Sequence, residues 1–211
     1  RVLGGSTDPR VKDAAGNALA ATFTSSFTTG APSACPCTLW SNTATPASLT
    51  DPDTNPLEVG VKFTSDVSGF ISALRFYKSP SSTGTHVGKL WTSSGTLLAS
   101  VTFTNETASG WQQASLSTPV AVTANTTYVV SYSTTRYPVS SGYFNSAYVN
   151  APLRAPSTTA GGGNGLYLYG SGGFPTQTYN AENYWVDVVF ETSAPTPDTT
   201  APTVTLVNPA N

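Results

Sequence analysis

The chain has 211 residues, of which 9% are charged, and its formal net charge is −2. Soluble proteins usually carry about 25% charged residues, so solubility must come here from Ser, Thr, Asn and Gly. No basic stripe exists to neutralise phosphates, which excludes nucleic acid as a partner. No apolar run reaches the ~20 residues of a transmembrane helix, so no membrane span is expected. The chain starts at Arg1 and contains no Met, as expected for a piece of a longer protein.

Residues 1–30 are expected to form a separate β segment. The stretch VKDAAGNALAATFTSSFTTG resembles the last two strands of a bacterial immunoglobulin-like domain. In that family a Lys-Asp-x-x-Gly-Asn turn precedes a final strand that ends in Phe-Thr-Thr. Strands without the rest of their domain have an open edge, which should pair with another part of this chain or with a neighbour.

Two cysteines, Cys35 and Cys37, flank Pro36. A disulfide is favoured because Pro36 can bend the chain enough to bring the two Cα atoms into bonding range. Free thiols and half of a metal site are the alternatives, and the metal would need ligands beyond the single His86. A bridge that closes so small a loop pins a turn and adds little to global stability.

The middle of the chain, residues 33–191, is expected to be one β domain. Apolar residues alternate along short runs, as in Leu97, Ala99, Val101 and Phe103, and polar turns separate the runs every eight to ten residues. This pattern predicts an all-β, jelly-roll-like antiparallel β-sandwich with negligible helix. Residues 155–165, rich in Ser, Thr and Gly, are expected to be a flexible loop. Strands are expected at 58–64, 70–78, 87–91, 96–103, 111–116, 127–132, 143–148, 166–169 and 184–191.

Acidic residues are scarce, and two interpretations of their positions remain open. Asp51 and Asp53 precede the first strand, and Glu58 and Asp187 lie on the first and last strands. A structural Ca²⁺ ion held by these four carboxylates is one interpretation. The other is an ionic network that fixes strand register. It would join residues that alternate with apolar neighbours: Glu58, Lys62, Arg75 and Asp187.

Aromatic residues are crowded after position 132, among many Gly and Asn residues. A sugar-binding surface needs exposed rings on which a pyranose can stack, and such rings anchor ligands at low entropic cost. Trp185 is expected to be packed because it lies in an apolar run. The residues predicted to form a ligand-binding face are Tyr137, Tyr143, Tyr167, Tyr169, Phe174 and Tyr179.

No catalytic constellation stands out, and we expect no enzyme activity. His86 lies between glycines and is expected to be a hydrogen-bonded structural group. No Gly-x-Ser-x-Gly elbow is present.

Residues 192–211 have the sequence TSAPTPDTTAPTVTLVNPAN. Their prolines predict a stiff, extended linker. The last nine residues resemble the first strand of another immunoglobulin-like repeat.

A set of motifs in the middle domain carries a second resemblance. They are CPCTLW at 35–40, LEVGVKF at 57–63, RFYK at 75–78, TGTHVGKLW at 83–91, ETASGWQQ at 106–113, ANTTYVVSY at 124–132 and NYWVDVVF at 183–190. In this order and spacing they resemble the bacterial family called domain of unknown function 4082, over residues 35–190. After position 132 the chain departs from the Pro-Asn-Gly-His segment that members often carry.

The resemblance implies the kind of protein in which the domain occurs, and it implies no catalytic reaction. Members of the family occur in large secreted proteins beside immunoglobulin-like repeats and sugar-active modules. We therefore expect a non-catalytic carbohydrate-binding module of a secreted or cell-surface bacterial protein, with a polysaccharide or glycan as its ligand. The alternative is a structural spacer or adhesin-like repeat that tethers or assembles other domains.

Overall fold

The computed structural model describes residues 12, 17, 35–170 and 172–194. The chain divides into two units, residues 1–32 and 33–211, and the second unit holds both β-sheets. The immunoglobulin-like strands expected in residues 1–30 and after residue 194 lie outside the described residues, apart from Lys12 and Asn17.

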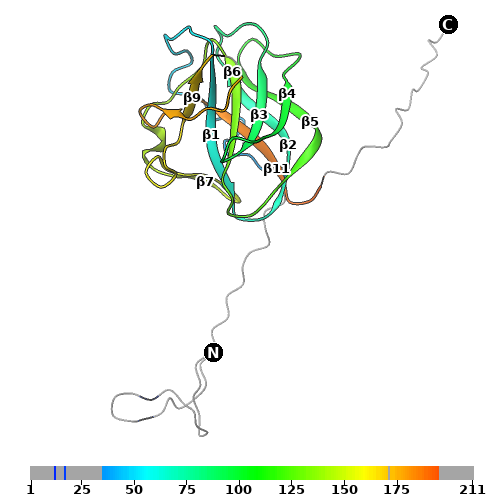
Figure 1. Cartoon of the computed structure of the whole chain (residues 1–211), viewed down its shortest axis with the longest axis vertical. Coiled ribbons are helices and arrows are strands. Elements are labelled where there is room, and N and C mark those ends of the chain that lie inside the picture. Colours follow the sequence, from blue (N-terminus) through cyan, green and yellow to red (C-terminus); the bar gives the residue numbers. More distant parts are fainter. Residues whose placement is uncertain (1–11, 13–16, 18–34, 171, 195–211) are drawn as a thin grey trace, which may run out of the picture. The chain divides into compact units, whose positions relative to one another are not determined.

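The larger of the two sheets has eight strands, and its main path runs β10-β9-β1-β6-β3-β4, with β8 and β7 added beside the end of β1 (Figure 1). Neighbouring strands of this sheet are antiparallel. Its strands are β1 (Leu57–Ser65), β3 (Val87–Thr92), β4 (Leu97–Thr102), β6 (Tyr128–Thr134), β7 (Tyr148–Asn150), β8 (Leu153–Ala155), β9 (Leu166–Tyr169) and β10 (Gln177–Thr178).

The second sheet has three antiparallel strands in the order β11-β2-β5. They are β2 (Gly69–Lys78), β5 (Gly110–Val122) and β11 (Val186–Glu191), and β11 crosses behind the larger sheet in Figure 1. The described residues contain no α-helix, and their one helical element is the 3₁₀ turn η1 (Tyr143–Asn145). The prediction of an all-β antiparallel sandwich is confirmed. No helix in this part of the chain is long and apolar enough to cross a membrane.

The core lies between the two sheets. Alternate residues of β1, such as Val59 and Val61, meet alternate residues of β11, such as Val188 and Phe190, and all four are fully buried. This is the packing that the alternating apolar pattern predicts, because side chains two apart on a strand share a face. The residues between them therefore point away from the shared core.

A β-bulge interrupts the alternation in β2. The register between β2 and β5 shifts between Ile71 and Ala73, so Ile71 and Leu74 both face the core although they are three residues apart. After the bulge the alternation resumes, which turns Arg75 to the outer face of the small sheet.

Part of the outer face of the large sheet is also covered. Trp91, Val129 and Leu166 form a second buried cluster there, with Phe174 packed against it. The segment 156–165, here named the covering loop, is fixed to β1 by the fully buried Asn164. The side chain of Asn164 accepts a hydrogen bond from the Lys62 N–H at 2.8 Å and donates one to the Lys62 carbonyl at 3.3 Å. The segment predicted to be a flexible loop is thus anchored through its amide side chain.

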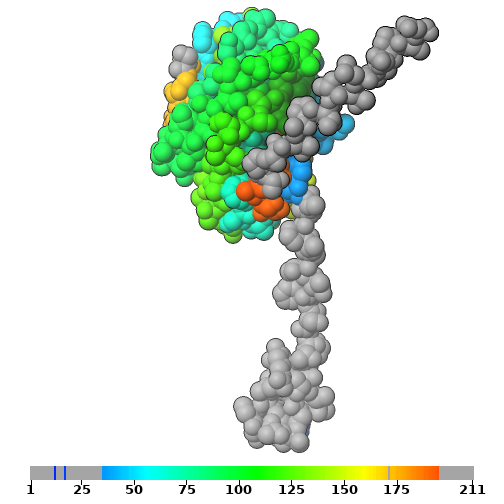
Figure 2. All heavy atoms as spheres, turned by 90° about the vertical axis from the view of Figure 1, so that its right-hand side faces the viewer, coloured from blue at the N-terminus to red at the C-terminus, as the bar shows by residue number. Residues whose placement is uncertain are grey.

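Residues 37–40, here named the strap, connect the start of the domain to its last strand. Cys37 and Phe190 exchange two backbone hydrogen bonds of 2.9 and 2.8 Å. In Figure 2 the blue start of the domain accordingly lies beside the orange end of β11. Trp40 is fully buried among the rings of Trp111, Tyr148 and Trp185.

The prediction of a strand at residues 143–148 is wrong, because a 3₁₀ turn occupies Tyr143–Asn145. Gly142 takes a left-handed conformation with φ +69°, and Asn145 then bonds back to its carbonyl in the 3₁₀ turn. The Phe144 N–H bonds to the carbonyl of Ala181 instead of joining a ladder. The pairing that does form starts at Tyr148, in β7.

Candidate functional site

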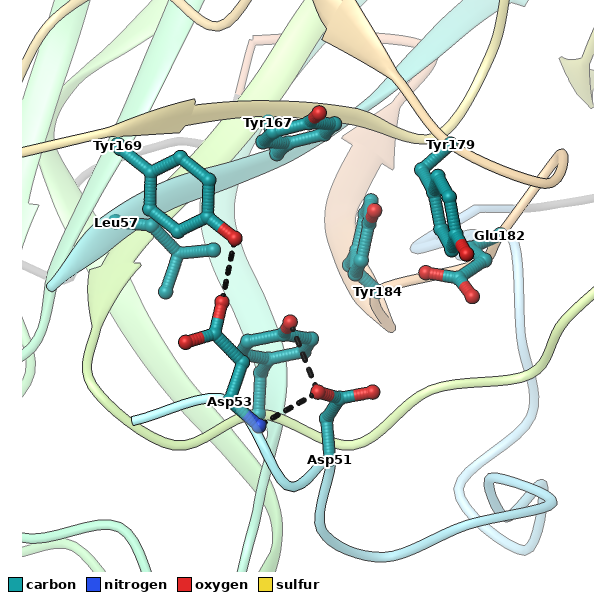
Figure 3. Close-up of a pocket in the computed structure, with 9 residues that line it drawn as sticks. Asp51, Asp53, Leu57, Tyr167, Tyr169, Tyr179, Glu182 and Tyr184 are labelled. Carbon is teal, nitrogen blue, oxygen red and sulfur yellow. Dashed lines mark hydrogen bonds between the residues drawn. The ribbon is translucent and has the colours of Figure 1, made fainter. Parts of the chain in front are cut away.

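A pocket of about 270 Å³ opens where β1 begins and β9 ends. Leu57 and Tyr169 lie opposite each other in the ladder between these strands. Figure 3 shows side chains that converge on the pocket from separate segments of the chain. The residues that line this tyrosine pocket are Asp51, Asp53, Leu57, Tyr137, Tyr167, Tyr169, Tyr179, Glu182 and Tyr184.

Five tyrosine rings surround the pocket. Tyr137 and Tyr184 are buried at 6% and 3% exposure, and their rings meet edge to face with centroids 5.6 Å apart. The rings of Tyr167 and Tyr169 meet in the same way, also at 5.6 Å. Tyr169 and Tyr179 are 53% and 59% exposed, so these two rings can contact a ligand from solvent.

Two carboxylates on the segment before β1 hold two of the rings. Asp51 Oδ1 accepts hydrogen bonds from the N–H of Asp53 at 2.9 Å and from the hydroxyl of Tyr137 at 3.2 Å. Asp53 Oδ2 accepts a hydrogen bond of 2.6 Å from the hydroxyl of Tyr169, as the dashed lines in Figure 3 show. Asp53 Oδ1 accepts from both nitrogens of Asn55, which fixes the turn. The acidic turn therefore orients aromatic rings.

The phenols of Tyr137, Tyr169 and Tyr184 remain neutral at physiological pH. The hydrogen bond to Asp53 raises the pKa of Tyr169 to about 12, and the same bond lowers the pKa of Asp53. Burial raises the pKa of Tyr137 and of Tyr184 well above the ordinary value. Each of these hydroxyls can donate a hydrogen bond, while the negative charge of the pocket resides on its carboxylates.

Glu182 is the third carboxylate of the pocket, and its side chain is largely buried. The pKa of Glu182 is raised. Burial is the largest cause, the charge of Asp51 adds to it, and the hydrogen bond with Tyr184 partly opposes it. None of the described residues that line the pocket is Lys, Arg or His. Glu182 therefore stands in a negative field.

The structure brings four of the six predicted ligand-binding rings to this pocket and places two elsewhere. Tyr143 packs against Trp40, and its hydroxyl accepts a hydrogen bond of 2.8 Å from Trp40 Nε1. Phe174 packs on Trp91 in the second buried cluster, with ring centroids 5.6 Å apart. Neither ring lines the pocket. The rings that do are Tyr137, Tyr167, Tyr169 and Tyr179.

Sequence reasoning missed Tyr184 and Glu182 as pocket residues. Both belong to the turn before the last strand, where the Glu182 N–H bonds to the carbonyl of Tyr179. The spacing Tyr-x-x-Glu-x-Tyr in that turn was the signal that could have found them. Tyr184 is buried, so its ring also completes the core below the pocket.

The structure does not bring Glu58 and Asp187 together, although both were predicted to bind one calcium ion. Glu58 is on β1 of the large sheet and Asp187 on β11 of the small sheet. Each alternates with core residues, so the two carboxylates leave the core through opposite faces of the sandwich. Asp51 and Asp53 hold phenols instead. The described residues contain no group of three or more His, Cys, Asp or Glu side chains placed to hold a metal ion.

The alternative of one four-membered ionic network is wrong. Lys62 donates to the carbonyl of Gly161 in the covering loop at 2.8 Å. Glu58 is fully buried and bonds to Lys89 Nζ and to the hydroxyl of Ser131, both at 2.6 Å. Burial raises the pKa of Glu58, and these two partners lower it. The ion-pair partner of Glu58 is therefore Lys89 on β3, which the sequence pattern did not identify.

Asp187 has its own partners on the small sheet. Its carboxylate accepts backbone hydrogen bonds from Leu39, Trp40 and Val188 at 2.9, 3.2 and 2.7 Å. Arg75 lies opposite it in the ladder between β2 and β11. The acid thus secures the strap to the last strand.

Cys35 and Cys37 are joined by a disulfide bond. The bond closes a loop around Pro36 and ties Cys35 to the first residue of the strap.

His86 lies in a buried polar chain. Its Nε2 and the hydroxyl of Ser82 are 2.7 Å apart, and its Nδ1 is 2.9 Å from both carboxylate oxygens of Glu106. Glu106 also pairs with Lys78 at 2.8 Å. Ser82 is 3% exposed and its oxygen also bonds to Thr134, so the hydroxyl is enclosed in the fold. These hydrogen-bonded side chains link β2, the segment before β3 and the turn after β4.

Comparison with protein families matches the chain to a family described as "Domain of unknown function (DUF4082)", over residues 43–186. Searches among curated proteins and among solved structures found no match to the chain. The matched range contains the whole tyrosine pocket and omits the strap and most of β11.

Proposed function

We propose that this chain, which belongs to the family of unknown function DUF4082, is a non-catalytic carbohydrate-binding module whose ligand site is the tyrosine pocket. The observation that carries the proposal is the composition of that pocket. Five aromatic rings and three carboxylates surround one opening at the end of the β1–β9 ladder.

The pocket offers the two kinds of contact that a sugar needs. The C–H face of a pyranose packs on an aromatic ring, and the exposed rings of Tyr169 and Tyr179 supply such surfaces. Sugar hydroxyls are hydrogen-bond donors, and carboxylates are strong acceptors that make charge-assisted bonds. Because Tyr169 is tied to Asp53, it loses little conformational entropy when a ligand binds.

The proposal includes the setting of the module. A disulfide between Cys35 and Cys37 is typical of an oxidising compartment, which supports a secreted or cell-surface location. The low fraction of charged residues supports it further. We place the module between immunoglobulin-like neighbours of a larger bacterial protein, on the resemblance of residues 1–30 and 203–211.

Affinity electrophoresis of the whole chain tests the proposal, in gels that contain cellulose, xylan, mannan, chitin or pectin. We expect at least one polysaccharide to retard the wild-type chain. Tyr169→Ala and Tyr179→Ala should each weaken this binding by about 1–2 kcal/mol, the worth of an aromatic contact at an interface. Neither variant should lose its fold, because both rings are more than half exposed.

Two matched variants separate the pocket from the rest of the surface. Leu97→Ala removes a side chain of similar exposure, 48%, from β4 and should leave binding unchanged. Tyr169→Phe keeps the ring and removes the hydrogen bond to Asp53, so it should bind better than Tyr169→Ala. If no gel retards the wild type, the spacer function replaces this proposal. If the alanine variants bind like the wild type, the sugar site is on another face.

A further inference from the structure

The tyrosine pocket carries charge of one sign. Three of the chain's 11 acidic residues line it, while none of its nine Lys and Arg residues is among the described lining residues. Among the described residues, the donors to Asp51 and Asp53 are all neutral: backbone N–H groups, the Asn55 amide and two phenols. These bonds orient the carboxylates and leave their charge uncompensated.

The aromatic rings add attraction of the same kind. The face of a tyrosine ring carries negative electrostatic potential, and a cation within about 6 Å of its centre is attracted, most strongly where water is excluded. The rings around this pocket stand at steep angles, 75° between Tyr137 and Tyr184 and 75° between Tyr167 and Tyr169. Figure 3 shows them on several sides of one space. A group in that space meets ring faces and edges from different directions.

Resting on the proposed function, we infer that this pocket is a cation cage, and that it selects sugars bearing a free ammonium group over neutral and acidic sugars. An amino sugar combines the two required parts, a pyranose face for the rings and an ammonium for the cage and the carboxylates. Acidic sugars are excluded because their carboxylates would meet three others.

The size of the pocket fits one sugar residue. Its volume of about 270 Å³ lies just below the ~300–1,000 Å³ of sites for drug-sized molecules. The exposed rings at its mouth, Tyr169 and Tyr179, leave room for a chain of sugars to continue into solvent. The cage therefore recognises a single amino group on a longer glycan.

Glu182 gives the selection a pH dependence. Its pKa is raised, so part of the negative charge of the cage appears only as pH rises through that pKa. Ammonium binding should strengthen over this range and weaken again at alkaline pH, where the ligand amine loses its proton. The titratable groups that face Glu182 across the pocket are Asp51 and Asp53 before β1, Tyr137 after β6, Tyr167 and Tyr169 on β9, and Tyr179 and Tyr184 on its own segment.

Three β-1,4-linked tetrasaccharides that differ only at carbon 2 test the inference. One carries a free amine, one an N-acetyl group and one a hydroxyl. Isothermal titration calorimetry of the whole chain should show the amine form binding about tenfold more tightly than either other form, a preference of the size that a desolvated cation–π contact supplies. Glu182→Gln should weaken this preference, because the ammonium group loses one of the three carboxylates that line the cage.

Controls identify the source of the preference. Glu191→Gln removes an acidic side chain on the small sheet, outside the pocket, and should keep the preference. Equal binding of the three forms overturns the inference and leaves the proposed function standing. Preference that survives in Glu182→Gln and vanishes in Glu191→Gln also overturns the inference, because the cation then binds elsewhere. Absence of binding by all three overturns the inference alone, because the gels with the five polysaccharides decide the proposed function.

Discussion

Asp187 is a buried charge whose hydrogen bonds reach two parts of the chain far apart in sequence. It accepts backbone N–H groups from the strap and from its own strand, and its strand neighbour Arg75 stacks over Trp111 at 4.5 Å. Burial raises the pKa of Asp187 to about 6, although Arg75 and the three N–H groups lower it. Arg75 Nη2 has no hydrogen-bond partner in the described part of the chain.

Removal of the Asp187 carboxylate should destabilise the domain strongly. Asp187→Ala leaves the strap N–H groups without their acceptor and the buried guanidinium of Arg75 without its neighbouring negative charge, at a cost of about 3 kcal/mol. The measurement is urea unfolding at pH 7. Asp66→Ala is the matched control, because Asp66 pairs with Arg154 on the surface and such pairs contribute at most about 1 kcal/mol. Equal losses in the two variants would contradict the structural role of Asp187.

The raised pKa of Asp187 predicts the sign of a pH effect. The folded protein binds this proton more tightly than the unfolded chain, whose aspartates titrate near pH ~4. The contribution of Asp187 to stability is therefore largest below about pH 4 and falls as pH rises to about 6. Glu58 and Glu182 contribute in the same direction and Asp53 and Asp66 in the opposite one. The difference in melting temperature between the wild type and Asp187→Asn should isolate Asp187, and a difference that stays constant from pH 4 to pH 6 would contradict the shift.

Individual site residues were only partly predictable from sequence. Crowding of aromatic residues after position 132 indicated Tyr167, Tyr169 and Tyr179, and the structure places these three rings around one pocket. It did not separate them from Tyr143, which packs against Trp40 and bonds to it across 103 positions in the chain. Partners so distant along the chain have no signature in local spacing.

At the scale of elements, the covering loop and the pocket depend on one close approach. Gly165 has φ +75°, and a Cβ placed on it would lie 1.8 Å from the carbonyl oxygen of Glu182. The end of the loop thus packs directly against the backbone that presents a pocket carboxylate. Any side chain at position 165 must push the two segments apart.

Gly165→Ala should therefore damage stability and binding together. We expect a loss of at least about 2 kcal/mol in unfolding free energy, from positive φ and overpacking combined, and loss of glycan retardation. Gly162→Ala is the control in the same loop. It also has positive φ, +60°, but its Cβ would meet nothing within 4 Å. If both variants behave alike, backbone strain rather than the contact with Glu182 sets the cost.

Strands were predictable where apolar residues alternate over at least six positions, and less so elsewhere. The alternation in β1, β3 and β4 located them within one or two residues, because one face must pack on the core. β8 and β10 have three and two residues, too few for any periodicity. The bulge in β2 is a consequence of its pairing with β5, which no local pattern records.

At the scale of the whole molecule, the domain is closed by residues outside the range of the family match. That range ends at residue 186, where β11 begins, and it starts after the strap. Both sheets bury apolar faces against each other, so removal of β11 would uncover the core residues Leu74 and Phe76. The structural domain is larger than the matched sequence.

A fragment of residues 43–186 should accordingly fail to fold, whereas a fragment of residues 33–194 should fold. The shorter fragment lacks Trp40, the strap and most of β11. Near-ultraviolet circular dichroism during heating should show a cooperative transition for the longer fragment only, since fixed aromatic packing produces that signal. A cooperative transition at the same temperature in both fragments would show that the strap and β11 are dispensable.

The pairing of Cys37 with Phe190 has a mechanical consequence. The two residues lie antiparallel, so the chain enters and leaves the domain at the same end of this pair. Tension applied through the flanking residues would load the two Cys37–Phe190 hydrogen bonds one after the other, in an unzipping geometry. In a shear geometry both bonds would carry the load together. The disulfide cannot brace the pair, because both its cysteines lie on the entering segment. Under tension the Cys37–Phe190 pair would therefore open first, and the domain would lengthen before its two sheets separate.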